Sequence, residues 1–129
     1  MANTIELIKN FNTLFSTLIQ QVSPFIGNNY YHLYNTVIKA NASIGIKTFY
    51  HYSLPHKQQI LSKDEHFFLD DENIKEIAKE NHNNETLLEI VDKIKHIWNS
   101  LDKESKNNLW DMITGLFLLA QEYGSLKNL

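Results

Sequence analysis

The stretch Leu109–Tyr123, LWDMITGLFLLAQEY, decides the fold class because it is apolar around almost its whole circumference. Just before it, large apolar side chains recur at alternating steps of four and three residues: Leu87, Val91, Ile94, Trp98 and Leu101. A period of 3.6 residues places side chains at these steps on one face of a helix. The two segments therefore predict a pair of amphipathic helices packed against each other, which is typical of a helical bundle.

Length and composition favour one domain that spans residues 1–129. A chain of 129 residues falls within the usual size of a single domain and can bury an independent core. The two prolines and four glycines suit helices and argue against a turn-rich β-sandwich. Without cysteine, the chain has no disulfide, no thiolate zinc site and no cysteine nucleophile. We expect an all-α, compact single-domain bundle of six to seven helices.

Capping residues and helix breakers predict where the helices begin and end. Asn3, with Glu6 three residues later, predicts a first helix over 4–22 that Pro24 ends. Asp102 predicts the start of a last helix that ends near Gly124. Between them, helices are expected over 30–40, 44–52, 55–61, 72–80 and 85–99.

The apolar periodicity also predicts the core and the inward face of the second helix. In that helix we expect four side chains to point inward: Leu33, Tyr34, Val37 and Ile38. The core should contain Trp98, Trp110, Ile94, Ile113, Leu116, Phe117, Ala120, Phe15, Phe11 and Leu18.

Charge is distributed unevenly along the chain. Residues 1–62 carry four lysines and one acid, for a net charge of +3, whereas residues 63–129 carry eight lysines and fourteen acids, for −6. All twelve cationic residues are lysines, so bidentate guanidinium recognition of phosphate or guanine is excluded. The acidic half disfavours general binding to polyanions, and we do not expect nucleic acid as the main partner.

The sequence predicts neither a membrane segment nor a secretion signal. No apolar run approaches the roughly 18 residues that a membrane span needs. The N-terminal stretch lacks a basic segment followed by a continuous apolar run. We therefore expect an intracellular protein that is not secreted and does not bind a membrane.

Three groups of polar residues could in principle carry metal chemistry. The first group, Asp64, Glu65, His66, Asp70, Asp71 and Glu72, lacks the glycine of an EF-hand loop, so helix capping in a solvated loop explains it better. The second group shares one helix face but lacks the paired Glu-x-x-His pattern of di-iron sites, so we interpret it as solvated: Glu85, Glu89, Asp92 and His96. The six histidines of the chain form no HExxH motif. We expect no catalytic residue, no metal ligand and no cofactor.

Five tyrosines in the first half form the second set of candidate functional residues: Tyr30, Tyr31, Tyr34, Tyr50 and Tyr52. Their helical spacing is what a helix core needs. Tyrosine also suits a protein interface, since its ring is apolar and its hydroxyl polar. A third alternative is stacking on unpaired bases beside Lys39, Lys47 and Lys57.

One segment, LPHKQQILSKDEHFFL at residues 54–69, carries a family resemblance. Three later elements accompany it: Ile97-Trp98-x-x-Leu101, Lys106-x-x-Leu109-Trp110 and the apolar run 116–119. In this order they resemble small all-helical proteins of large nucleocytoplasmic DNA viruses of the mimivirus-like kind, which share an I-x-x-K-D-E-x-F-F element. The resemblance covers about residues 44–123. His56 departs from it, because an aromatic residue is expected there.

The resemblance implies a place in an infected host cell, in the cytoplasm or the viral factory, or in the virion. It implies no activity. Within the shared element, Asp64 and Glu65 would cap a helix and position Phe67 and Phe68, or these four residues would form a docking element. We expect a non-enzymatic viral accessory or virion-associated protein that binds another protein, viral or host. Self-association is compatible with this expectation, and the alternative is a nucleic-acid-associated accessory factor in viral transcription or packaging.

Overall fold

The computed structural model describes residues 3–64 and 85–129, and within these ranges it contains helices and no strand. The prediction of an all-α bundle is therefore confirmed for the described part of the chain. In chain order, the elements are α1 (Thr4–Ile26), α2 (Asn29–Ala40), α3 (Ile44–Ser53), the 3₁₀ turn η1 (Leu54–His56), α4 (Lys57–Leu61), α7 (Glu85–Ile97), the 3₁₀ turn η3 (Trp98–Ser100) and α8 (Lys103–Leu126).

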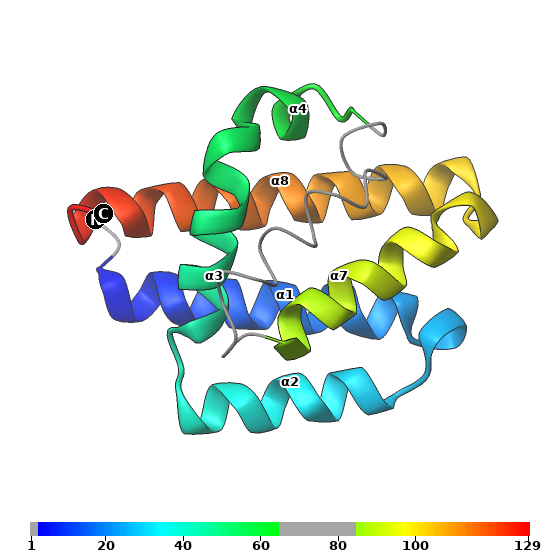
Figure 1. The fold of residues 1–129 in the computed structure, drawn as a ribbon, viewed down its shortest axis with the longest axis horizontal. Coiled ribbons are helices and arrows are strands. Elements are labelled where there is room, and N and C mark those ends of the chain that lie inside the picture. The colour runs from blue at the N-terminus through cyan, green and yellow to red at the C-terminus, as the bar shows by residue number, and fades with distance from the viewer. Residues whose placement is uncertain (1–2, 65–84) are drawn as a thin grey trace.

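The two longest helices, α1 and α8, lie side by side and form the backbone of the bundle (Figure 1). Helix α2 packs along α1 and returns in the opposite direction after a short connection. Helix α3 crosses both α1 and α8, and α7 packs against α1 and α2. The beginning of α1 and the end of α8 lie at the same end of the bundle (Figure 1).

The core forms where these helices meet, and all ten predicted core residues are buried in it. Within this core, the indole rings of Trp98 and Trp110 pack edge to face, with their centroids 5.7 Å apart and the ring planes at 78°. Aromatic pairs favour this arrangement because the positive ring edge meets the negative ring face. Buried apolar residues of both predicted helices belong to this core, but the two helices do not pack mainly on each other: α7 packs against α1 and α2, and α8 packs against α1 and α3. The tryptophan contact joins η3, which follows α7, to α8.

Both predicted helix caps are present. The backbone N–H of Glu6 donates to Oδ1 of Asn3 at 2.9 Å, and that of Ser105 donates to Oδ1 of Asp102 at 2.7 Å. Each bond satisfies a donor that the first turn of a helix leaves without a partner. The hydrogen bonds from Ser105 lower the pKa of Asp102, because they favour its ionised form.

The prediction that Pro24 ends the first helix is wrong, since α1 continues to Ile26. Pro24 lies in the last turn, where its missing N–H costs one hydrogen bond to the carbonyl of Gln20. Gln20 is exposed, so a water molecule can donate a hydrogen bond to that carbonyl. The helix ends at Gly27, whose positive φ of 91° is favourable for glycine alone and whose N–H donates to the carbonyl of Ser23 at 2.7 Å.

The predicted count of six to seven helices is not matched, because five helices of ten residues or more form the described bundle. The helix expected over 55–61 is a 3₁₀ turn around Pro55 followed by the five-residue α4. Proline lacks the N–H that a continuous α-helix would need there. The helix expected over 72–80 lies outside the described residues.

Candidate functional site

The predicted docking element is described only at its first residue. Asp64 is half-buried, and its backbone N–H donates to the carbonyl of Gln59 at 2.9 Å. Glu65, Phe67 and Phe68 lie outside the described residues. The docking element therefore stays a prediction.

The five candidate tyrosines divide into two groups. The rings of Tyr34, Tyr50 and Tyr52 lie in the core, with exposed fractions of 1%, 8% and 7%. Burial raises the pKa of both Tyr34 and Tyr52, because the phenolate would have to form away from water. These three tyrosines fit the core alternative and cannot stack on a base without unfolding. Tyr30 and Tyr31 are half-buried on α2 and remain accessible in part.

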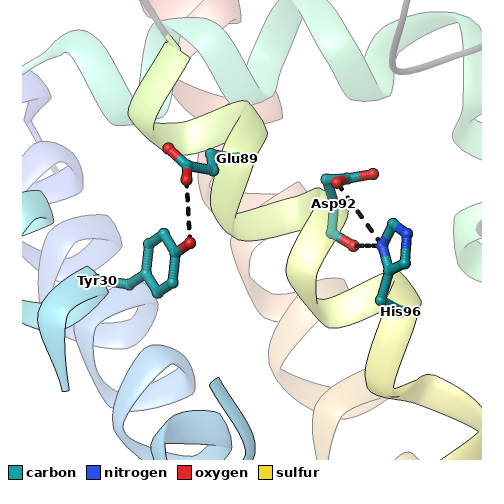
Figure 2. A network of polar contacts seen from close by, with 4 residues as sticks. All are labelled: Tyr30, Glu89, Asp92 and His96. Atoms are coloured by element: carbon teal, nitrogen blue, oxygen red, sulfur yellow. Dashed lines mark hydrogen bonds and ion pairs between the residues drawn. The ribbon is translucent and has the colours of Figure 1, made fainter. Parts of the chain in front are cut away.

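Tyr30 belongs to a contact between α2 and α7 (Figure 2). Its hydroxyl donates to Oε1 of Glu89 at 3.0 Å. The pKa of Tyr30 is raised, first by burial and then by the hydrogen bond to Glu89 and the negative charges of Glu89 and Asp92. One turn along α7, Nδ1 of His96 lies 2.8 Å from the carbonyl of Asp92 and 3.6 Å from its carboxylate. Figure 2 shows that these are two separate contacts and not one convergent site.

The polar face of α7 is thus a surface with local partners, as we expected for a solvated face. Glu89 and His96 are exposed. Within residues 3–64 and 85–129, no three histidine, aspartate or glutamate side chains come together in a geometry that could hold a metal ion. In the same ranges, no helix combines the length and apolarity needed to cross a bilayer.

A small cavity lies inside the bundle, between α1, α3, α4, α7 and α8. Its volume is about 30 Å³, and the side chains around it include Phe15, Phe49, Ile60, Ile94 and Trp110. A space of this size holds little more than one water molecule, and an apolar space of this kind stays dry. The cavity is a packing feature and is too small for a metabolite.

A much larger opening, the α1–α2 groove, lies on the outer surface between these two helices and has a volume of about 600 Å³. On α1 its lining residues recur at helical spacing, on a face separate from the one that packs into the core. On α2 the lining residues also recur at helical spacing, and two of them, Tyr31 and Ile38, are half-buried and pack against the core as well. Within residues 3–64 and 85–129, the lining is Ile5, Ile8, Lys9, Asn12, Thr13, Ser16, Thr17, Gln20, Tyr31, Asn35, Ile38 and Ala42.

Apolar side chains gather toward one end of the groove. Ile5 and Ile8 come from the beginning of α1, and Ile38 comes from the end of α2. Because the two helices run in opposite directions, these three residues belong to the same end (Figure 1). Ile5 is 76% exposed, the highest value among the large apolar side chains described. Tyr31, from the first turns of α2, lies toward the other end.

Hydrogen bonds fix the floor of the groove. The side-chain amide of Asn12 donates to the carbonyl of Ala42 at 2.9 Å, and its Oδ1 accepts from the hydroxyl of Tyr34 at 2.8 Å. Asn35 donates through its amide to the carbonyl of Tyr31 at 3.0 Å. These bonds join α1, α2 and the connection that leads to α3. The groove is therefore formed in advance, which lowers the entropy that a ligand must overcome on binding.

We did not predict this groove from the sequence. The available signal was a second stripe on the first helix, Ile5, Lys9, Asn12, Ser16 and Gln20, at steps of four and three residues. An isoleucine on an otherwise polar stripe is easily attributed to chance. Of the α2 side chains that we expected to face inward, Tyr34 is buried, Ile38 packs against the core and also borders the groove, and Leu33 is 45% exposed.

Comparisons of the chain with protein-family models, with curated proteins and with solved structures found no match.

Proposed function

We propose that the protein is a non-enzymatic binding protein and that the α1–α2 groove is the surface that contacts its partner, another protein. The observation that carries this proposal is the exposed Ile5, which lies with the half-buried Ile8 and Ile38 at one end of a groove that is already formed. A large apolar side chain such as Ile5, left 76% exposed, loses favourable burial that a partner can restore.

The chemistry of the lining suits a protein ligand. Ile8, Ile38 and Tyr31 offer apolar contact, while Ser16, Thr13 and Gln20 place hydroxyl and amide groups between them. Protein-binding surfaces commonly combine apolar anchors with neutral hydrogen-bonding groups. Lys9 is the single charged residue among the described residues of the lining, so little charge has to be desolvated there on binding.

The family resemblance of residues 54–69 supports a more specific form of this proposal. In that form, the protein is a viral accessory or virion-associated protein and meets its viral or host partner in the infected cell, in the cytoplasm or viral factory, or in the virion. The element at 64–68 would then be a second candidate docking surface.

Site-specific photo-crosslinking tests the role of the groove. A photoreactive amino acid replaces Thr13, an exposed lining residue, and in a parallel variant it replaces Leu118, which is 56% exposed on α8. We expect one discrete protein adduct from position 13 in infected cells and none from position 118. The substitution Ile5→Glu should remove the adduct. Equal adducts from both positions, or an adduct that survives Ile5→Glu, would contradict the proposal.

A second candidate function, association with nucleic acid, is favoured by one observation. Helices α1, α2 and α3 expose Lys9, Lys39 and Lys47 and contain a single acid, Glu6. Titration against single-stranded DNA and RNA at low and high salt tests this candidate, because phosphate contacts weaken steeply as salt rises. Binding that is absent or insensitive to salt would exclude it.

A further inference from the structure

We infer that the occupant of the α1–α2 groove is an amphipathic α-helix of about four turns with acidic residues along its edges. This inference rests on the proposed function of the groove as a protein contact and names the kind of partner segment that fits it.

The length of the groove sets the length of the occupant. Its lining on α1 runs over sixteen residues, from Ile5 to Gln20, which corresponds to about 22 Å along a helix axis. The groove runs between two helices that pack along each other (Figure 1). A third helix laid into such a groove packs its side chains between the rows of the other two. Helix-in-groove recognition uses apolar anchors spaced over two or more turns on one face.

The distribution of apolar residues sets the pattern of the occupant. The cluster of Ile5, Ile8 and Ile38 calls for two large apolar anchors, one turn apart, at one end of the bound helix. Toward Tyr31 and Gln20, an amphipathic residue suits the mixed lining better than an aliphatic one. The backbone of a helix is already hydrogen-bonded, so the occupant needs few polar groups from the floor of the groove. Asn12 and Asn35, which are engaged within the protein, fit this requirement.

The charges around the groove determine which side chains are favoured along the edges of the bound helix. Lys9 lies within the lining, none of the described lining residues is an aspartate or glutamate, and Lys39 is exposed one residue after Ile38. Carboxylates on the edges of the occupant are attracted to such a surface, and lysines are repelled. Because these charges are exposed, they contribute selectivity and not most of the affinity.

A display library of 16-residue helical peptides tests the inference with the full-length protein as target. The apolar positions of one face are fixed, and each edge position is varied among glutamate, glutamine and lysine. Selection on the wild-type protein should enrich glutamate at the edges at least threefold over lysine. Selection on Lys9→Glu should reduce or reverse this preference, and the selected peptides should bind at least tenfold more weakly to Ile5→Glu. Leu118→Glu, on α8, is the matched control and should bind like the wild type.

Circular dichroism verifies that each variant folds, which is expected because both substituted apolar residues are about half exposed or more. Enrichment of lysine or glutamine, selected peptides that ignore Ile5→Glu, or a failure to select any peptide would overturn the inference. A dimer that disperses in Ile5→Glu would also overturn it, since the occupant would be a second copy of the chain. The proposed function can be tested separately from this inference. A partner that crosslinks from position 13 through a non-helical segment would contradict the acidic helix alone and leave the proposed function intact.

Discussion

Gly124 of α8 lies directly against the ring of Tyr50 of α3, so closely that a Cβ atom at position 124 would overlap the ring carbons. Tyr50 is buried, and its hydroxyl donates to the carbonyl of Leu129 at 3.3 Å. The missing side chain at position 124 is therefore what allows α3 to cross α8 at close range. The ring of Tyr50 cannot move aside easily, because it is packed in the core.

The substitution Gly124→Ala should lower the free energy of unfolding by about 1–3 kcal/mol, since an added methyl group must displace a packed ring. This loss is expected even though alanine favours a helix over glycine by about 1 kcal/mol. Urea denaturation followed by circular dichroism measures it. Gly115→Ala, in the same helix, is the matched control: its Cβ would meet only Cδ2 of Leu14, at 3.0 Å, and that side chain can move. The control should keep or raise stability, and equal gains for both variants would contradict the contact.

Gly124 also illustrates what the sequence could and could not predict. A glycine near the end of a periodic segment indicates a helix stop, yet α8 continues past Gly124 to Leu126. The contact with Tyr50, and not a helix end, requires glycine at position 124. Gly45 is similar, since a Cβ there would overlap the hydroxyl of Tyr34. Both contacts join residues distant in sequence, and local spacing carries no information about them. The positions of the core residues were predictable because burial on one face of a helix leaves a local period.

The α1–α2 groove was not predictable for a related reason. Periodicity identifies the face of the first helix that packs into the core, through Phe11, Phe15 and Leu18. It does not reveal which second face a neighbouring helix leaves open, because that depends on how α2 and α3 are placed. For the tyrosines, spacing alone left core and interface alternatives open, and only the packing of α3 against α1 and α8 places Tyr50 and Tyr52 inside.

Stability should fall as the pH rises above about 10. Burial raises the pKa of Tyr34 and Tyr52 above their ordinary value of 10.0. Above that pH, the unfolded chain releases two phenolic protons that the folded chain keeps, so the unfolded state binds fewer protons and becomes more favourable. The contribution of these two groups is fully present below pH 10. It is lost above that pH at about 1.4 kcal/mol per pH unit for each tyrosine.

Urea denaturation between pH 8 and pH 11.5 checks this expectation. Tyr52→Phe should reduce the slope with which the free energy of unfolding falls above pH 10, by the contribution of one tyrosine. This change in slope is independent of the effect of the substitution on stability at pH 8. Tyr31→Phe is the control, because Tyr31 is half-buried on the surface of α2 and should leave the slope unchanged. Identical slopes in the wild type and Tyr52→Phe would show that the buried hydroxyl does not control the decline.

The small internal cavity predicts a stabilising substitution. Val91 of α7 is half-buried and belongs to the lining of this space of about 30 Å³. Val91→Ile adds one methylene group in apolar surroundings, which is worth about 0.8 kcal/mol when it fits without strain. We expect the melting temperature to rise. Val37→Ile, on the half-buried face of α2, is the control for the change in side-chain size and should shift stability by less than about 0.5 kcal/mol. A loss of stability in Val91→Ile would indicate that the space cannot accept a methyl group.

The bond between Asn12 and Tyr34 predicts a specific pattern in a double-mutant cycle. Asn12→Ala removes the acceptor of the Tyr34 hydroxyl and the donor to the carbonyl of Ala42, and should cost about 1–3 kcal/mol because a polar group on a buried residue loses its partner. In Tyr34→Phe, Asn12 keeps its bond to Ala42 and its Oδ1 can turn to water, so the loss should be smaller. The double variant should lose less than the sum of the two single losses, with a coupling of at least 0.5 kcal/mol, as expected for residues in direct contact. Strict additivity would mean that the two side chains do not interact in solution and that the floor of the α1–α2 groove is held by other contacts.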